Sequence, residues 1–212
     1  MKFISHRGYW KTSGEKNSQD AFRRSFNLGF GTETDIRDCA GELVISHDIP
    51  NGTEMTVDTF FQIFNETKCP GSLALNIKSD GLQKPLIDLI LKYQIDNYFL
   101  FDMSVPDAVV SFKDGLKTYT RQSEYETVCS FYDSAIGVWM DEFYSDWITN
   151  AIVEGHINND KKVCIVSPEL HGRDPVEKWK QYRDLTGLNN SDNITLCTDV
   201  PEFAKEFIYG KN

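Results

Sequence analysis

Several features of disulfide-rich, membrane-spanning and nucleic-acid-binding proteins are missing from this 212-residue chain. Its 5 cysteines are odd in number and widely spread, and no CxxC pair occurs, which is typical of small buried side chains in a reducing compartment. No apolar run reaches the roughly 18 residues that a membrane helix needs. Basic residues are few, 22 against 32 acidic ones, and the net charge of −10 opposes binding to nucleic acid and anionic lipid surfaces.

Nothing resembling a secretion signal stands at the start, where residues 2–6 already have the pattern of a strand. We therefore expect a cytoplasmic protein that has a small-molecule partner and makes no stable association with membrane or nucleic acid. A small anion can still bind, because one local cation overrides the global field. Oligomeric state is not predicted.

Short strand-like runs alternate with helix-like segments from end to end. Strands are expected at 2–6, 31–36, 72–78, 98–101, 116–120, 135–140, 162–166 and 193–197, and a short strand at 43–46 pairs back on the second. Eight strands, each followed by a helix, predict one α/β domain over residues 1–212, a single (β/α)8 TIM barrel. An open doubly wound sheet is the alternative, since periodicity does not prove closure.

Three polar clusters carry most of the functional signal, and each ends a short apolar run. The clusters are His6-Arg7-Gly8, Glu33-Thr34-Asp35 and His47-Asp48. Polar groups at the carboxyl ends of strands are where barrels and open α/β sheets place their chemistry. The pattern therefore favours an enzyme.

Glu33 and Asp35 lie two residues apart in an expected strand and so point to the same side. Inside a barrel mouth, two uncompensated carboxylates are costly unless a cation lies between them. Their oxygens suit Mg²⁺ or Ca²⁺ better than zinc. The alternative is a solvated outer face with ordinary salt bridges, and the flanking histidines favour the metal site.

His6 and His47 suit the transfer of protons, because imidazole titrates near neutral pH. Phosphodiester cleavage needs a base for the nucleophile and an acid for the leaving alkoxide, and two histidines can fill both roles. Arg7 offers a fixed fork for phosphate oxygens, and Gly8 permits close backbone approach. Asp48 either orients His47 or caps the loop.

Further polar residues follow the later strands and predict one mouth lined for an anionic ligand. They are Lys78, Asp102, Arg121, Asp141 with Glu142, and Glu169 with His171. Arg121 and Trp139 are candidate substrate-binding residues, although a core position is the more expected one for Trp139. Asp102 and Asp141 also suit turns and helix caps.

The chain resembles the glycerophosphodiester phosphodiesterase family of phospholipase-C-like phosphodiesterase barrels. The resemblance rests on His6-Arg7-Gly8, Ala21-Phe22, Gly31–Ile36, Val44–Asp48, Asn76-Ile77-Lys78 and Thr198–Pro201. It implies that His6 and His47 form the acid/base pair and that Arg7 and Lys78 hold phosphate. It also implies that Glu33 and Asp35 bind a divalent metal, Mg²⁺ or Ca²⁺, and that a cyclic phosphate can form and then open.

Two departures from the family pattern concern the metal and the substrate. Asn76 stands where the family usually has a third carboxylate ligand, so one negative charge is missing, and Asp102 and Asp141 are weaker candidates to replace it. Only 27 residues separate Asp48 from Asn76, where the family often carries a longer insertion. A more open mouth is therefore expected.

These features lead to one main hypothesis, a metal-dependent phosphodiesterase acting on a glycerophosphodiester or related lipid headgroup. One alternative is a non-catalytic phosphoester-binding barrel with a degraded metal site at Asn76. Another is a sphingomyelinase-D-like lyase that leaves a cyclic phosphate. A hydrolase of a non-phosphate substrate rests on fold analogy alone.

Overall fold

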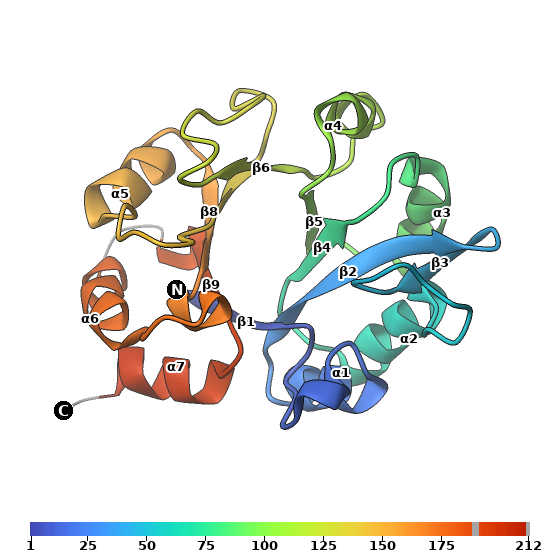
Figure 1. Ribbon diagram of the computed structural model, residues 1–212, viewed down its shortest axis with the longest axis horizontal. Coiled ribbons are helices and arrows are strands. Elements are labelled where there is room, and N and C mark those ends of the chain that lie inside the picture. Colours follow the sequence, from blue (N-terminus) through green and yellow to red (C-terminus); the bar gives the residue numbers. More distant parts are fainter. Residues whose placement is uncertain (188–190, 211–212) are drawn as a thin grey trace. The chain divides into compact units, whose positions relative to one another are not determined.

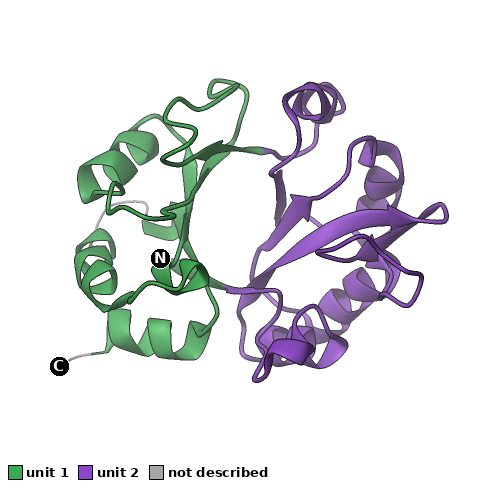
Figure 2. Cartoon of the chain, viewed as in Figure 1, with its two compact units in different colours: residues 1–4, 119–212 green, residues 5–118 purple. Residues whose placement is uncertain are grey.

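The computed structural model describes residues 1–187 and 191–210 of the chain (Figure 1). The chain divides into two compact units, one of residues 5–118 and one of residues 1–4 with 119–212 (Figure 2). Each unit is built from parallel strands and the helices that connect them. Among the described residues, no helix is long and apolar enough to cross a membrane.

The unit of residues 5–118 contains three parallel strands and one antiparallel strand. Its strands are β2 (Gly31–Cys39), β3 (Glu42–Ile45), β4 (Leu73–Ile77) and β5 (Tyr98–Phe101). Its α-helices are α1 (Gln19–Asn27), α2 (Val57–Thr67), α3 (Gln83–Tyr93) and α4 (Val105–Lys113). The strand β3 pairs antiparallel with β2, and β4 pairs in parallel with β2 and β5.

Aromatic packing between α1 and α2 forms the centre of this unit's core. Phe22 and Phe60 are fully buried, with their ring centroids 4.7 Å apart in an edge-on arrangement. Both helices begin at capped positions, because the side chains of Ser18 and Thr56 accept hydrogen bonds from backbone N–H groups three residues on. The cap at Ser18 fixes where α1 starts and therefore where the preceding polar loop ends.

The other unit has four complete strands and three α-helices among its described residues. Its strands are β6 (Tyr119–Gln122), β7 (Gly137–Met140), β8 (Lys162–Val166) and β9 (Ile194–Thr198). Its α-helices are α5 (Asn150–Asn158), α6 (Val176–Leu185) and α7 (Pro201–Tyr209). Trp179 of α6 is fully buried and packs its ring against Phe203 and Phe207 of α7.

One nine-stranded sheet contains all the described strands, eight of them parallel. Its order is β5-β4-β2-β1-β9-β8-β7-β6, with β3 paired to β2 and with β1 spanning Lys2–His6. Residues 4 and 5 of β1 belong to different units. Most positions of the parallel strands are buried, as expected for a sheet flanked by helices.

The element pattern read from the sequence is correct in most places and wrong in two. The strands at 98–101 and 162–166 have the predicted bounds. No helix follows β6, because residues 123–136 form turns and bends, so the expectation of a helix after every strand is wrong there. The predicted strand 116–120 lies instead at 119–122, and Thr118 makes only an isolated bridge to Leu100.

Candidate active site

Two neighbouring parallel strands place three polar side chains together. Glu33 and Asp35 of β2 are 2% and 0% exposed, and Asn76 of β4 lies directly opposite Asp35 in the register. Residues paired across parallel strands point to the same side and lie about 4.8 Å apart. The predicted common orientation of the two carboxylates is therefore present, on the buried side rather than on a solvated one.

Two cations and one amide surround the Asp35 carboxylate. Arg7 Nε is 3.1 Å from Oδ2, and Lys78 Nζ is 3.5 Å from Oδ1. Asn17 Nδ2 donates to Oδ2 at 3.1 Å. The expectation that the paired carboxylates lack compensation is wrong for Asp35, because Arg7 and Lys78 supply it.

The loop from Arg7 to Asn17 holds a strained backbone that positions these groups. Arg7, Gly8 and Asn17 have φ values of 57°, 79° and 59°, and strain of this kind persists where surrounding contacts enforce it. Asn17 N–H donates to Arg7 C=O at 2.9 Å and closes the loop. A Cβ at Gly8 would lie 2.7 Å from the Cβ of Ala21, so this position requires glycine.

Glu33 lies in an environment that favours its neutral form. Burial raises the pKa of its carboxyl well above the ordinary value, and the nearby charge of Asp35 raises it further, while Arg7 and Lys78 oppose the shift. Its Oε2 atom is 3.9 Å from His6 Nε2. The imidazole of His6, 17% exposed, therefore lies between a buried carboxyl group and solvent.

Four buried side-chain oxygens in this unit accept no hydrogen bond, and three of them belong to the candidate site: Glu33 Oε2, Asp35 Oδ1 and Asn76 Oδ1. The fourth is Asp107 Oδ2. Hard oxygen atoms of carboxylate and amide groups are the ligands that Mg²⁺ and Ca²⁺ prefer. No cluster of three His, Cys, Asp or Glu suited to a metal occurs within residues 1–187 and 191–210. The donor set fits a hard divalent cation with one charge fewer than a three-carboxylate site.

Besides facing Asp35 across the sheet, Asn76 contacts the acidic residue Asp102. Its Nδ2 donates to Asp102 Oδ2 at 3.3 Å, and Asp102 has a positive φ of 66° just after β5. Asp102 and Asp141 are the two weaker candidates for a metal ligand, and Asp102 is the one that contacts Asn76.

His47 differs from His6 in its surroundings. Its ring is 45% exposed, and Nδ1 lies 2.9 Å from Asp48 Oδ1. The guanidinium of Arg37 donates to the His47 carbonyl from two nitrogens at 3.2 Å. Asp48 thus contacts the His47 ring, as expected of a residue that orients the imidazole.

The remaining candidates form a second polar cluster, in the unit of residues 119–212. Trp139 is buried, and its indole N–H donates to Asp141 Oδ2 at 3.0 Å. Asp141 Oδ1 lies 3.2 Å from His171 Nε2. Arg121 Nε is 2.5 Å from Glu126 Oε2 and 4.0 Å from Asp141 Oδ2.

The loop after β7 is held by Glu124, which gives a pH prediction. Burial opposes ionisation of Glu124, but backbone N–H groups of Tyr144, Phe143 and Ser145 donate to its carboxylate and lower its pKa from 4.5 to about 2. The depressed pKa means that this stabilisation is present above the ordinary pKa and is lost as pH falls through about 2. We expect the amides of Tyr144 and Ser145 to stay protected from hydrogen exchange down to that range.

In Glu124→Gln, the same amides should exchange faster already at a pH of about 6, because the charged acceptor is gone. Amide exchange followed by NMR measures both effects. Equal protection in the variant and the wild type would show that the carboxylate does not hold the loop.

Comparison with solved structures finds close similarity in fold at low sequence identity. A glycerophosphodiester phosphodiesterase from Agrobacterium tumefaciens superposes with a TM-score of 0.69 at 14% identity, covering 96% of this chain and 99% of that one. A glycerophosphoryl diester phosphodiesterase from Parabacteroides distasonis gives 0.67 at 16% identity, covering 98% and 85%. An Oleispira antarctica phosphodiesterase in complex with the product sn-glycerol-3-phosphate gives 0.67 at 13%, covering 98% and 96%.

No protein-family model matches the chain, and no curated protein matches it. The chain has the α/β TIM-barrel fold of the glycerophosphodiester phosphodiesterases. The predicted fold class and the predicted resemblance, taken as a likeness of fold, are confirmed.

Sequence reasoning missed Asn17, which contributes directly to the site. Besides donating to Asp35, its side-chain Oδ1 accepts a hydrogen bond from the Thr34 hydroxyl at 2.9 Å. Asn17 stands directly before Ser18, the residue that caps α1. An asparagine directly before that cap is the signal that could have pointed to a second role.

Proposed function

We propose that the protein is a metal-dependent phosphoric diester hydrolase acting on a glycerophosphodiester or a related lipid-headgroup phosphodiester. The observation that carries the proposal is the group formed by Arg7, Lys78 and Asp35 next to Glu33 and His6. It combines phosphate-binding cations, a carboxylate pair and an imidazole at the ends of strands. The fold likeness to several glycerophosphodiester phosphodiesterases supports the same chemistry.

Glu33, Asp35 and Asn76 are the residues that would hold Mg²⁺ or Ca²⁺. When bound, such an ion neutralises a non-bridging phosphate oxygen and lowers the pKa of the attacking group. Arg7 and Lys78, about a fifth exposed, are placed to orient the phosphate and stabilise charge that grows at phosphorus. The residues Arg121 and Trp139 stay predicted substrate contacts.

His6 and His47 are proposed as the acid/base pair. One imidazole takes the proton of the nucleophile and the other gives a proton to the leaving alkoxide. Asp48 accepts from Nδ1–H of His47, which leaves Nε2 of that ring as the atom that exchanges a proton with substrate.

A hydrolysis assay tests the proposal directly. A panel of glycerophosphodiesters is incubated with Mg²⁺, Ca²⁺ or a chelator, and ³¹P NMR identifies the product. Release of a phosphomonoester only when metal is present supports the hydrolase. Accumulation of a cyclic phosphate indicates the lyase alternative, and no turnover contradicts both.

A second candidate function is a non-catalytic barrel that binds a phosphoester. The observation in its favour is Asn76, whose amide contacts Asp102 and contributes no charge of its own to the carboxylate pair. This alternative expects phosphoester binding in calorimetry that is independent of metal and is not followed by cleavage.

Substitution Asn76→Glu is expected to tighten metal binding by about tenfold, because it adds a negative charge beside Glu33 and Asp35. Isothermal titration with Mg²⁺ and Ca²⁺ measures the change. The variant Asn97→Glu adds the same charge at an exposed position before β5 and is expected to leave the affinity unchanged. Equal affinities in wild type and Asn76→Glu would mean that residue 76 does not face the ion.

The predicted cytoplasmic location and the single domain over residues 1–212 stay part of this proposal. So does a role in lipid metabolism, with a small phosphodiester as the partner.

A further inference from the structure

The loop between Gly8 and Asn17 carries an aromatic residue that is attached to the candidate site. The indole N–H of Trp10 donates to the His6 carbonyl at 3.2 Å. At its other end the loop returns to Asn17, whose amide binds Asp35. Trp10 and Lys16 therefore lie next to two residues of the site.

A lysine covers the ring of Trp10. Lys16 Nζ lies 4.6 Å from the centroid of the Trp10 ring, a cation–π arrangement. Lys11 makes a similar contact with Tyr9 at 3.8 Å. The charge of Lys11 is partly balanced by the Glu15 carboxylate, whose pKa it helps to lower. No carboxylate among the residues that the structure describes lies within 4.0 Å of the Lys16 ammonium, so that charge is unbalanced at short range.

The loop that presents these lysines is fixed by one carboxylate. Glu15 accepts from the Lys11 backbone N–H at 2.9 Å and from Arg24 Nη1 at 2.8 Å. The same Arg24 nitrogen donates to the Tyr9 carbonyl at 2.6 Å. The conformation that sets Lys16 over Trp10 is thus held by hydrogen bonds to its neighbours.

The charge of Lys16 bears on which class of substrate this position would favour. An open indole beside a phosphodiester site would attract the quaternary ammonium of a choline ester, because aromatic faces bind such cations. Here Lys16 occupies that face and repels a second cation. Its unbalanced charge attracts an anion instead, since opposite charges nearby favour each other even where the whole molecule is acidic.

We propose that Trp10 and Lys16 form a specificity element that favours phosphodiesters whose alcohol carries a further anionic group, a carboxylate or a second phosphate. The inference rests on the proposed phosphodiesterase function. Trp10 fixes the position of Lys16, and Lys16 contacts the anionic group of the substrate.

The test uses three glycerophosphodiesters whose second alcohol has a two-carbon chain but a different charge: choline (cationic), ethanol (neutral) and glycolate (anionic). For the wild type we expect kcat/KM to fall from the glycolate ester to the ethyl ester to the choline ester. In Lys16→Met, which keeps an apolar side chain over Trp10, the glycolate-to-ethyl ratio should fall by about three- to tenfold. The same ratio in wild type should fall as salt rises.

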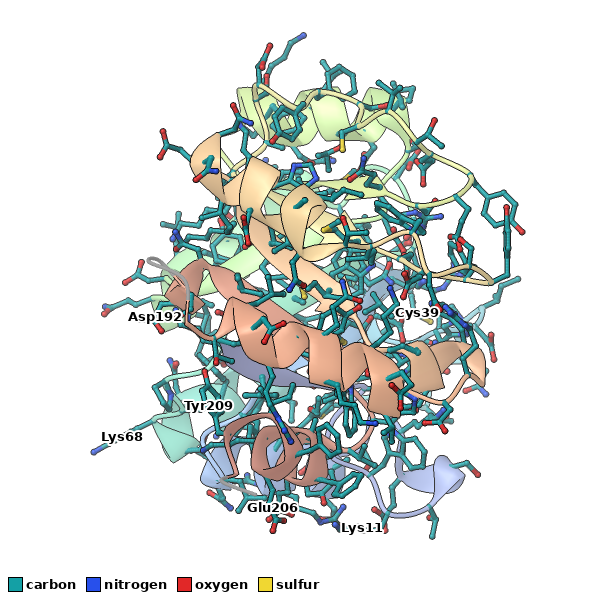
Figure 3. The ribbon with its side chains drawn as sticks, turned by 90° about the vertical axis from the view of Figure 1, so that its left-hand side faces the viewer. Lys11, Cys39, Lys68, Asp192, Glu206 and Tyr209 are labelled. Atoms are coloured by element: carbon teal, nitrogen blue, oxygen red, sulfur yellow. The ribbon has the colours of Figure 1, made fainter. Side chains whose placement is uncertain are left out.

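Lys68→Met is the matched control. Lys68 is exposed at the end of α2, before β4 begins, whereas the candidate site lies where the strands end. Figure 3 shows Lys68 and Lys11 well apart, Lys68 at the left of the view and Lys11 below and right of the centre. This variant should keep the wild-type order of substrates.

The outcomes separate the two proposals. Turnover of the three esters with an unchanged ratio in Lys16→Met overturns this inference and leaves the proposed function standing. A wild-type preference for the choline ester also overturns it. No turnover of any ester by the wild type contradicts the proposed function, and the inference with it.

Discussion

Replacing His6 by alanine is expected to lower kcat for glycerophosphodiester hydrolysis by about 10²- to 10⁴-fold, the usual contribution of a general acid or base. The reason lies in the position of the ring, one-sixth exposed and 3.9 Å from the Glu33 carboxyl group. Steady-state rates with saturating metal give the measurement.

A stability control accompanies this substitution. The melting temperature of His6→Ala should stay within a few degrees of wild type, because a side chain next to solvent contributes little to folding. His47→Ala should reduce kcat in the same range if the two imidazoles share the proton transfers. Unreduced turnover in His6→Ala would remove the imidazole from the mechanism.

The second large effect concerns stability. Asp35→Ala is expected to lower the free energy of unfolding by about 3 kcal/mol, because it leaves Arg7 and Lys78 without their common partner. Breaking a buried ion pair typically costs about 3 to 5 kcal/mol. The Arg7 and Lys78 side chains keep some exposure to solvent, so we expect a loss of stability at the lower end of that range. Urea unfolding in the presence of chelator measures the change without any contribution from metal.

Asp38→Ala is the control on the same strand. Asp38 is exposed and accepts one hydrogen bond from the Ser79 hydroxyl, so its loss should cost under about 0.5 kcal/mol. If Asp35→Ala and Asp38→Ala unfold at the same urea concentration, the charge group at Asp35 does not stabilise the fold.

Much of the fold could be predicted from the sequence because its strands are short and buried. Segments such as Tyr98–Phe101 and Lys162–Val166 read as apolar runs between polar turns, and their bounds are correct. The bounds of segments without that pattern were harder to predict. Leu116 is buried but precedes β6, and Phe30 continues the apolar stripe of α1 although α1 ends at Asn27.

The candidate site was predictable as far as residues at strand ends reveal it. His6, Arg7, Glu33, Asp35 and Lys78 are indeed brought together. The sequence could not show how their charges are balanced, because that depends on contacts between residues far apart in the chain. Arg7 and Asp35 are 28 positions apart, and only the folded structure places one against the other.

The contact between Asn17 and Asp35 and the contact between Lys16 and the Trp10 ring could not be predicted from the sequence for the same reason. Asn17 reaches Asp35 because the loop from Arg7 folds back through three residues with left-handed φ values, Arg7, Gly8 and Asn17. The lysine over Trp10 depends on that same turn. Local patterns predict strands and caps, whereas side-chain partners across a loop are set by tertiary packing.

The most direct test of the central claim is the rate of glycerophosphodiester hydrolysis as Mg²⁺ or Ca²⁺ is added to metal-free protein. For a metal-dependent hydrolase we expect the rate to rise to saturation with the ion and chelator to return it to zero, with sn-glycerol-3-phosphate or another phosphomonoester as the product. Binding of phosphodiester without cleavage at any metal concentration, or a rate indifferent to chelator, would contradict this expectation.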